Sequence, residues 1–277
     1  MDNQRQSNRV PTKLFCLFFI LFILVFTPTI AWLFERWTMG VWHNGHSLLI
    51  SVAVIYLIWK KLQKKSLLAK SSSPLGFVIL LPALLLHMID TGINTQLLSA
   101  AAFFLSLPGF SLILIGIERT KAILFPLSML FFTLPIPLAF TESIHLALRH
   151  IATNCTGWLL KFVGVPNFTS GTLIEIPNGS LMVADACSGF STLYATITIA
   201  ILTAYLCPSI LRRVLVLCIA IPLAISVNIV RVFTLTMLVH WIGLDILATS
   251  AHEISGLLTF TISLPIIFWL GQTPIKD

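Results

Sequence analysis

The sequence contains few charged residues. Only 10% of its 277 residues are Asp, Glu, Lys or Arg, whereas 57% are hydrophobic. Soluble domains usually carry about 25% charged residues, and the mean hydropathy of this chain is +0.97. The charges are also clustered, which leaves uncharged apolar stretches of bilayer-spanning length. This scarcity of charge excludes an ordinary soluble protein.

The apolar stretches also lack the alternation of apolar and polar residues that is typical of outer-membrane barrels. In lipid, backbone N–H and C=O groups must bond within the protein, which continuous apolar segments achieve as helices. We therefore predict an all-α fold, a polytopic transmembrane helical bundle, in which residues 1–277 form a single integral membrane domain.

Cysteine is scarce as well, and the five cysteines have no regular spacing. This excludes a disulfide framework and a cysteine-based zinc site. His252-Glu253 resembles half of a zincin motif, but no histidine lies four residues after His252. Two close histidine pairs are the remaining candidates for metal ligands, His43 with His46 and His145 with His150. Interfacial histidines hydrogen-bonded to water or lipid headgroups are the simpler interpretation, so we expect no metal and no cofactor.

Eight apolar segments are predicted to cross the membrane. They are Leu14–Phe34, Ser47–Leu62, Pro74–Met88, Leu97–Ile117, Ala122–Phe140, Ser188–Leu206, Arg213–Trp241 and Ser255–Leu270. The first segment follows a polar and basic tail, residues 1–13, and a cleaved signal peptide is its alternative interpretation. Because the segment is long for a signal sequence and lacks a good small-residue cleavage site, we expect a retained span.

The distribution of lysine and arginine predicts the orientation in the membrane. If the N-terminus is cytoplasmic, 13 of the 17 basic residues fall in cytoplasmic segments, as the positive-inside rule requires. Topology therefore explains the net charge of +7, and we do not expect nucleic-acid binding. We predict an inner-membrane protein with both termini in the cytoplasm and with residues 142–186 on the extracytoplasmic side.

The segment 142–186 differs from the predicted spans. In residues 142–163, polar side chains such as His145 and Arg149 recur at helical spacing, which favours an interfacial or re-entrant amphipathic helix. From Pro166 to Ala186, polar residues alternate with apolar ones between glycines and prolines. This pattern predicts a short extracytoplasmic β-hairpin with Pro177-Asn178-Gly179 as its turn.

Three polar residues are predicted to lie near the outer ends of the last three spans. Cys187 stands where the hairpin leads into a helix, and the positive end of a helix dipole favours a thiolate and lowers its pKa. Arg231 lies inside an apolar span, where a guanidinium requires a polar cavity or partner. His252 precedes the last span, and an imidazole exchanges protons near neutral pH. A thiol, a fixed cation and an imidazole together favour acyl transfer.

Each of these residues also has a structural interpretation. Cys187 taken alone is a free cysteine of a membrane helix, and Arg231 is a structural charge paired with Asp185 or Asp245. His252 is a satisfied interfacial histidine. A disulfide between Cys155 and Cys187 is a further alternative in an oxidising compartment, and it would block the nucleophile.

Three short segments resemble the signature regions of the exosortase/archaeosortase family. They are Ala186-Cys-Ser-Gly, Asn228-Ile-Val-Arg231, and His252 with Gly256 and Phe260. The similarity continues upstream in Trp42-His-Asn-Gly-His, in the proline-rich residues 125–137 and in residues 171–186. One departure is Phe190-Ser-Thr, where many bacterial members carry an arginine. The resemblance extends from about residue 37 to about residue 265.

This resemblance implies a protein-sorting cysteine protease and transpeptidase, with Cys187 as nucleophile, Arg231 as partner of the oxyanion or substrate carbonyl, and His252 as general acid/base. The implied partners are membrane lipid and exported proteins with a C-terminal sorting signal. That signal consists of a short motif such as Pro-Glu-Pro (PEP-CTERM-like), a transmembrane helix and a basic tail. Cleavage through a thioester would transfer the new carboxyl end to an unidentified surface acceptor, such as a polysaccharide or a lipid-linked molecule.

Four neighbouring residues are expected to bind substrate or to orient the catalytic groups, namely Asp185, Ser188, Asn228 and Glu253. We expect that Asp185 or Glu253 orients His252 or Arg231. The alternative function is a non-enzymatic transporter or an assembly factor for surface polysaccharide, in which Arg231 binds substrate and Cys187 is incidental. A simple intramembrane hydrolase is the third interpretation.

Overall fold

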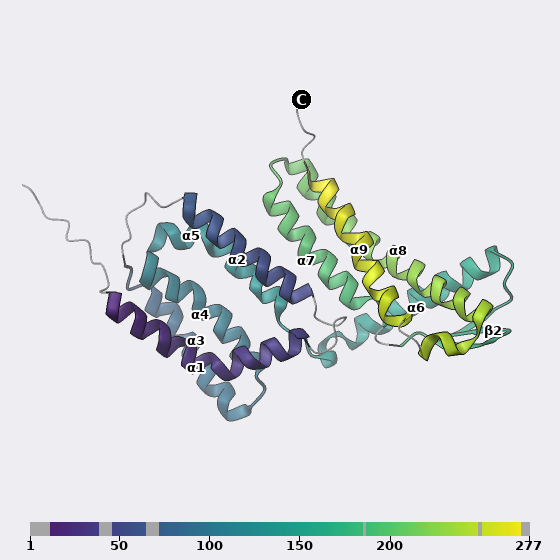
Figure 1. Ribbon diagram of the computed structural model, residues 1–277, viewed down its shortest axis with the longest axis horizontal. Coiled ribbons are helices and arrows are strands. Elements are labelled where there is room, and N and C mark those ends of the chain that lie inside the picture. Colours follow the sequence, from purple (N-terminus) through teal and green to yellow (C-terminus); the bar gives the residue numbers. More distant parts are fainter. Residues whose placement is uncertain (1–11, 39–45, 65–71, 185–186, 249–250, 273–277) are drawn as a thin grey trace, which may run out of the picture. The chain divides into compact units, whose positions relative to one another are not determined.

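The computed structural model describes residues 12–38, 46–64, 72–184, 187–248 and 251–272. The chain divides into two compact units, Met1–Pro135 and Ile136–Asp277. Figure 1 shows that both units are built mainly of helices. The helices of the first unit are α1 (Thr12–Thr38), α2 (His46–Lys64), α3 (Gly76–Ile93), α4 (Leu97–Ile115), α5 (Ile117–Met129) and the 3₁₀ helix η1 (Leu130–Thr133).

The first unit has an aromatic core and a helical hairpin. Phe22 and Phe26 of α1 pack against α3 and α4, and the ring centroids of Phe22 and Phe103 are 5.8 Å apart. The buried carboxylate of Asp90 near the end of α3 accepts the backbone N–H of Ser99 in the first turn of α4, over 2.9 Å. Side-chain capping of this kind satisfies an N–H group that has no partner within its own helix.

The second unit contains all the predicted site residues. Its elements are α6 (Leu138–Phe162), β1 (Phe168–Ser170), β2 (Leu173–Ile176), β3 (Gly179–Met182), α7 (Phe190–Leu206), α8 (Ile210–Ile242), the 3₁₀ helix η3 (Leu244–Ala248) and α9 (Ala251–Gly271). The helices α7, α8 and α9 contact one another, and α6 packs against α8 (Figure 1). The candidate site lies where α6 and α9 approach α7 and α8.

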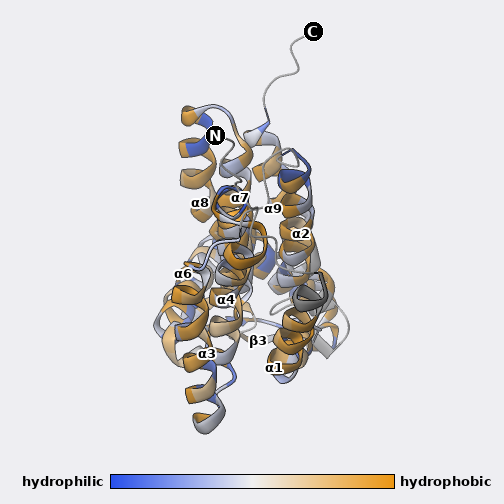
Figure 2. Cartoon of the chain, turned by 90° about the vertical axis from the view of Figure 1, so that its left-hand side faces the viewer, coloured by the Kyte–Doolittle hydropathy of each residue, from blue (hydrophilic) through white to orange (hydrophobic). Residues whose placement is uncertain are grey.

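The predicted all-α polytopic class is confirmed. Among the described residues, five helices are long and apolar enough to cross a membrane, namely α1, α3, α4, α8 and α9, and α7 is a shorter apolar helix. Figure 2 shows hydrophobic residues along most of the length of the helices. Large apolar side chains on these helices are exposed, for example Leu24, Val78 and Phe268, as contact with lipid requires. The chain is a multi-pass membrane protein, whereas the count of eight spans stays a prediction.

The predicted span 122–140 is not one continuous helix. The helix α5 ends at Met129, η1 follows, and α6 begins only at Leu138. Pro135 and Pro137 cause this break, because proline has no N–H to donate and disfavours a helical residue before it. The helix predicted for residues 142–163 is present as the larger part of α6.

The predicted hairpin is present and belongs to a three-stranded antiparallel sheet. Strands β2 and β3 pair with Ile176 opposite Gly179, so the predicted turn joins them. Strand β1 adds a third strand on the other side of β2. Sequence analysis missed β1, which has only three residues and no clear alternation of its own.

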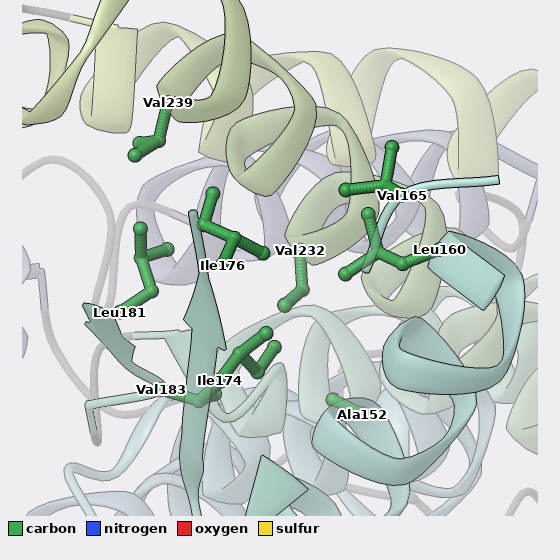
Figure 3. Close-up of a cluster of buried hydrophobic side chains, with 9 residues drawn as sticks. All are labelled: Ala152, Leu160, Val165, Ile174, Ile176, Leu181, Val183, Val232 and Val239. Carbon is green, nitrogen blue, oxygen red and sulfur yellow. The ribbon is translucent and has the colours of Figure 1, made fainter. Parts of the chain in front are cut away.

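A cluster of buried apolar side chains joins the sheet to α6 and α8. Its members are Ala152, Leu160, Val165, Ile174, Ile176, Leu181, Val183, Val232 and Val239 (Figure 3). Cys187 is partly buried against this cluster. The sheet therefore packs on the two helices, and the chain continues from its last strand, β3, towards the start of α7.

Candidate active site

Cys187, Ser188 and Gly189 form a tight connection before α7, here called the Cys-Ser-Gly turn. The backbone N–H of Cys187 donates to the carbonyl oxygen of Ala184 over 2.9 Å. Gly189, the N-cap of α7, has a φ of +82°, and a Cβ at this position would overlap the side chain of Asn228. Only glycine meets both conditions without strain.

Asn228 of α8 binds the Cys-Ser-Gly turn from one side. Its side chain is buried, and Nδ2 donates to the carbonyl oxygens of Cys187 over 3.3 Å and Ser188 over 3.1 Å. Its Oδ1 is buried without a hydrogen-bond partner among the described atoms. Because both carbonyls are bound to one amide, the position of Cys187 follows the position of α8 at Asn228. The expectation that Asn228 binds substrate or orients a catalytic group stays a prediction.

Arg231 lies on α8, close to Cys187. It follows Asn228 by three residues, a spacing that puts both side chains on one face of a helix. Arg231 is 8% exposed, and its Nε donates to Ser255 Oγ of α9 over 3.1 Å. Arg231 and Cys187 also interact electrostatically. The structure therefore brings together the predicted thiol and cation and supplies Ser255 as a polar partner, which sequence analysis missed.

The surroundings of Cys187 differ from the expected helix N-terminus. Burial raises the pKa of the Cys187 thiol above its ordinary value, while the positive charge of Arg231 acts in the opposite direction. The expectation of a pKa lowered by the dipole is wrong, because Cys187 precedes the N-cap Gly189 by two residues and packs against apolar side chains. Dipole effects fall off within the first turn of a helix. The surroundings of Cys187 therefore favour the neutral thiol over the thiolate.

Three of the predicted residues fall partly or wholly outside the described part of the chain. Asp185 is not among the described residues. His252 and Glu253 lie in the first turn of α9, and their side chains are outside the described ones. Residue 252 precedes Ser255 by three positions, so the two positions share one side of α9. The roles of these three residues stay predictions.

His145 contacts the Cys-Ser-Gly turn from α6. Its Nδ1 is 2.9 Å from Ser188 Oγ, which also accepts the backbone N–H of Phe190 over 3.3 Å. The imidazole stacks on the ring of Phe190 with the centroids 4.5 Å apart. Sequence analysis noted His145 only as a polar residue of the amphipathic helix and as a candidate metal ligand. No signal in the sequence placed it beside residue 188.

The sequence left open a disulfide between Cys155 and Cys187 and a metal site formed by histidines. Neither Cys155 nor Cys187 is in a disulfide, so the predicted alternative of a disulfide between them is wrong. Among the described residues, no three His, Cys, Asp or Glu side chains are grouped closely enough to hold a metal ion. His43 lies outside the described residues.

The family model described as transmembrane exosortase matches residues 37–269. This range is most of the chain and includes Cys187, Arg231 and His252. No curated protein and no solved structure matches the chain.

Proposed function

The chain belongs to the transmembrane exosortase family, and from this premise we propose that it is a cysteine transpeptidase that removes C-terminal sorting signals from exported proteins. Family membership indicates a membrane enzyme that sorts proteins and processes exported substrates with such signals. The observation that carries the proposal is the position of Cys187, half-buried beside the cation of Arg231 in a multi-pass membrane protein.

The first half of the proposed reaction forms a thioester. Cys187 Sγ attacks the scissile carbonyl carbon while His252 accepts the thiol proton. The negative charge that develops on the carbonyl oxygen is stabilised by the Arg231 guanidinium, which Ser255 orients through the Nε hydrogen bond. When the tetrahedral intermediate collapses, the C–N bond breaks, and His252 returns the proton to the leaving amine of the sorting signal.

The second half releases the new carboxyl end. A hydroxyl or amine of the acceptor loses its proton to His252 and attacks the thioester carbonyl carbon. The C–S bond then breaks, and His252 returns the proton to the Cys187 sulfur. Water in place of the acceptor gives hydrolysis. The acceptor that we propose is a polysaccharide or a lipid-linked molecule at the cell surface.

The membrane brings the substrate and the enzyme close together. We propose that the site lies on the outer face of the inner membrane, with both termini in the cytoplasm. This orientation agrees with the excess of Lys and Arg in the predicted cytoplasmic segments. A substrate that is anchored by its own transmembrane helix can approach α7–α9 laterally. Its cleavage motif is then held at a fixed depth, which reduces the entropy lost on reaching the thiol.

The test is the processing of an exported protein that ends in a Pro-Glu-Pro motif, an apolar helix and a basic tail. Cells carry the wild-type chain, Cys187→Ala or the control Cys155→Ala, which removes another partly buried free cysteine. We expect the tail to be lost with the wild type and with Cys155→Ala, and retained with Cys187→Ala at equal membrane abundance. The intact mass of the product distinguishes a free carboxyl end from a transferred one.

Two results would overturn this proposal. Equal removal of the tail with wild type and Cys187→Ala would exclude cysteine catalysis. Full function of Cys187→Ser would favour a transporter or assembly factor, in which Arg231 binds substrate and the thiol has no role.

A further inference from the structure

We propose that His145 is a positioning residue for the Cys187 nucleophile and acts through Ser188. This inference rests on the proposed function, since it assigns a task in the reaction of the same site. The inference is based on the contacts among His145, Ser188 and Phe190.

The first observation is the hydrogen bonding of Ser188. This side chain is only 1% exposed and follows Cys187 directly in the chain. Its Oγ lies 2.9 Å from His145 Nδ1 and accepts the N–H of Phe190 over 3.3 Å. A hydroxyl has one proton to donate and two lone pairs. Phe190 uses one lone pair, so a single further partner, His145, fixes the rotation of the hydroxyl.

The second observation is the stacking of the imidazole on Phe190. The two ring centroids are 4.5 Å apart and the planes are inclined by 29°. The hydrogen bond fixes one edge of the imidazole, and the stacking fixes its plane. His145 is therefore held in one orientation by two residues that flank Gly189 in the sequence.

The third observation is that the Cys-Ser-Gly turn is hydrogen-bonded to a second helix, α8, as well as to α6. Asn228 of α8 binds the carbonyl oxygens of Cys187 and Ser188, whereas His145 of α6 binds the Ser188 side chain. The Cys-Ser-Gly turn is thus bound to two different helices through different atoms. Removal of the His145 bond leaves the backbone carbonyls bound but releases the Ser188 side chain. The nucleophile can then rotate relative to Arg231.

The expected effect follows from the sensitivity of catalysis to geometry. A displacement of about 1 Å at a reacting group can lower a rate about 100-fold. We expect loss of the hydrogen bond to lower kcat by about 10- to 100-fold with little change in KM, because His145 acts on the nucleophile. A residue that only stabilised the fold would instead lower the amount of active protein.

The experiment separates the hydrogen bond from the ring. His145→Phe retains a ring that can stack on Phe190 and lacks the hydrogen bond, whereas His145→Asn retains a polar group near the position of Nδ1 and lacks the ring. His150→Ala on the same helix is the control, since His150 shows no hydrogen bond to the turn among the described contacts. Processing of the tailed substrate gives kcat and KM, and mass spectrometry of membranes treated with iodoacetamide gives the alkylation rate of Cys187.

We expect His145→Phe to lose about 10- to 100-fold in kcat, His145→Asn to recover most of this loss, and His150→Ala to resemble the wild type. Ser188→Ala combined with His145→Phe should be no slower than Ser188→Ala alone, because Ser188→Ala already removes the bond to His145 together with the bond from the Phe190 N–H. Wild-type kcat in His145→Phe would overturn the inference, as would additive losses in the double variant.

Failure of the proposed function gives a different pattern. If Cys187→Ala processes the substrate normally, cysteine catalysis is wrong whatever His145 does. The alkylation assay needs no substrate. A changed alkylation rate of Cys187 in His145→Phe, restored in His145→Asn, would then still support the positioning of Cys187 by His145, and an unchanged rate would refute it.

Discussion

Replacing Gly189 by alanine is expected to destabilise the candidate site by an amount that can be divided into two parts. Gly189 has a φ of +82°, and a Cβ there would overlap the buried side chain of Asn228. An L-residue in the left-handed region costs about 1–2 kcal/mol. Displacement of Asn228 would also break its hydrogen bonds to Cys187 and Ser188, and each bond contributes about 1 kcal/mol. We therefore expect a loss of about 3–4 kcal/mol in the free energy of unfolding.

Gly164 provides a matched control for the backbone part of this loss. It has a φ of +80°, and a Cβ at this position would meet no atom within 4 Å. Gly164→Ala thus carries the conformational cost without the overlap, and it should lower the free energy of unfolding by about 1–2 kcal/mol. The difference between the two variants, about 2 kcal/mol, belongs to the hydrogen bonds of Asn228.

The assay is unfolding of the full-length protein in detergent micelles, together with processing of the tailed substrate. Gly189→Ala should be less stable than Gly164→Ala and should lose most of its activity, whereas Gly164→Ala should remain active. In an Asn228→Ala background the difference in stability should shrink, because the two nearest overlapping atoms, Cγ and Nδ2, and the two hydrogen bonds are absent, whereas the Cβ of residue 228 still lies 2.8 Å away. Equal stability and equal activity of the two glycine variants would refute the role assigned to Asn228.

Four further predictions concern the cation, the thiol and the topology. Ser255→Ala removes the acceptor of the Arg231 Nε proton and should lower the processing rate about 10-fold. Arg231→Lys should lower the same rate about 100-fold. A processing rate of Ser255→Ala equal to that of the wild type would exclude the orienting role of Ser255. Since burial raises the pKa of Cys187 and Arg231 lowers it, Arg231→Gln should move the pH profile of Cys187 alkylation to higher pH, and a shift to lower pH would contradict this electrostatic account. The neutral buried thiol stabilises the fold below its ordinary pKa, and this contribution is lost as the pH rises through the raised folded pKa, so Cys187→Ala should reduce the alkaline loss of stability measured by pH-dependent unfolding. A cysteine at exposed Ser180 of β3 should react with a membrane-impermeant maleimide in intact cells, whereas one at Lys61 should not, and the reverse pattern would invert the topology.

Hydropathy was sufficient to predict the fold class and several of the helices, because lipid forces continuous apolar segments into helices. The segment predicted at Arg213–Trp241 is part of α8 (Ile210–Ile242), and Ser255–Leu270 lies within α9. The interruption before Leu138 was not predicted, because a mean hydropathy does not register the missing N–H groups of Pro135 and Pro137.

The site was predictable only in part, since burial and long-range contacts depend on packing. The pairing of Cys187 with Arg231 was expected from their predicted depth. The raised pKa of Cys187 was not expected, because the apolar cluster beside it is assembled from α6, α8 and the sheet. In the same way, the sequence does not distinguish His145 from His150, although only His145 is seen to bond to Ser188 among the described contacts.

The spacing of Asn228 and Arg231 explains how one helix can fix the relation between a nucleophile and a cation. A residue advances 100° around an α-helix, and positions three apart lie on adjacent turns of one face. Asn228 binds the carbonyl oxygen of Cys187, and Arg231 interacts electrostatically with its thiol. Because both side chains stand on the same rigid helix, a movement of α8 carries the cation and the thiol together. The relative position of the two groups therefore depends on the geometry of α8, on Gly189, and on the contact of Ser188 with His145 of α6.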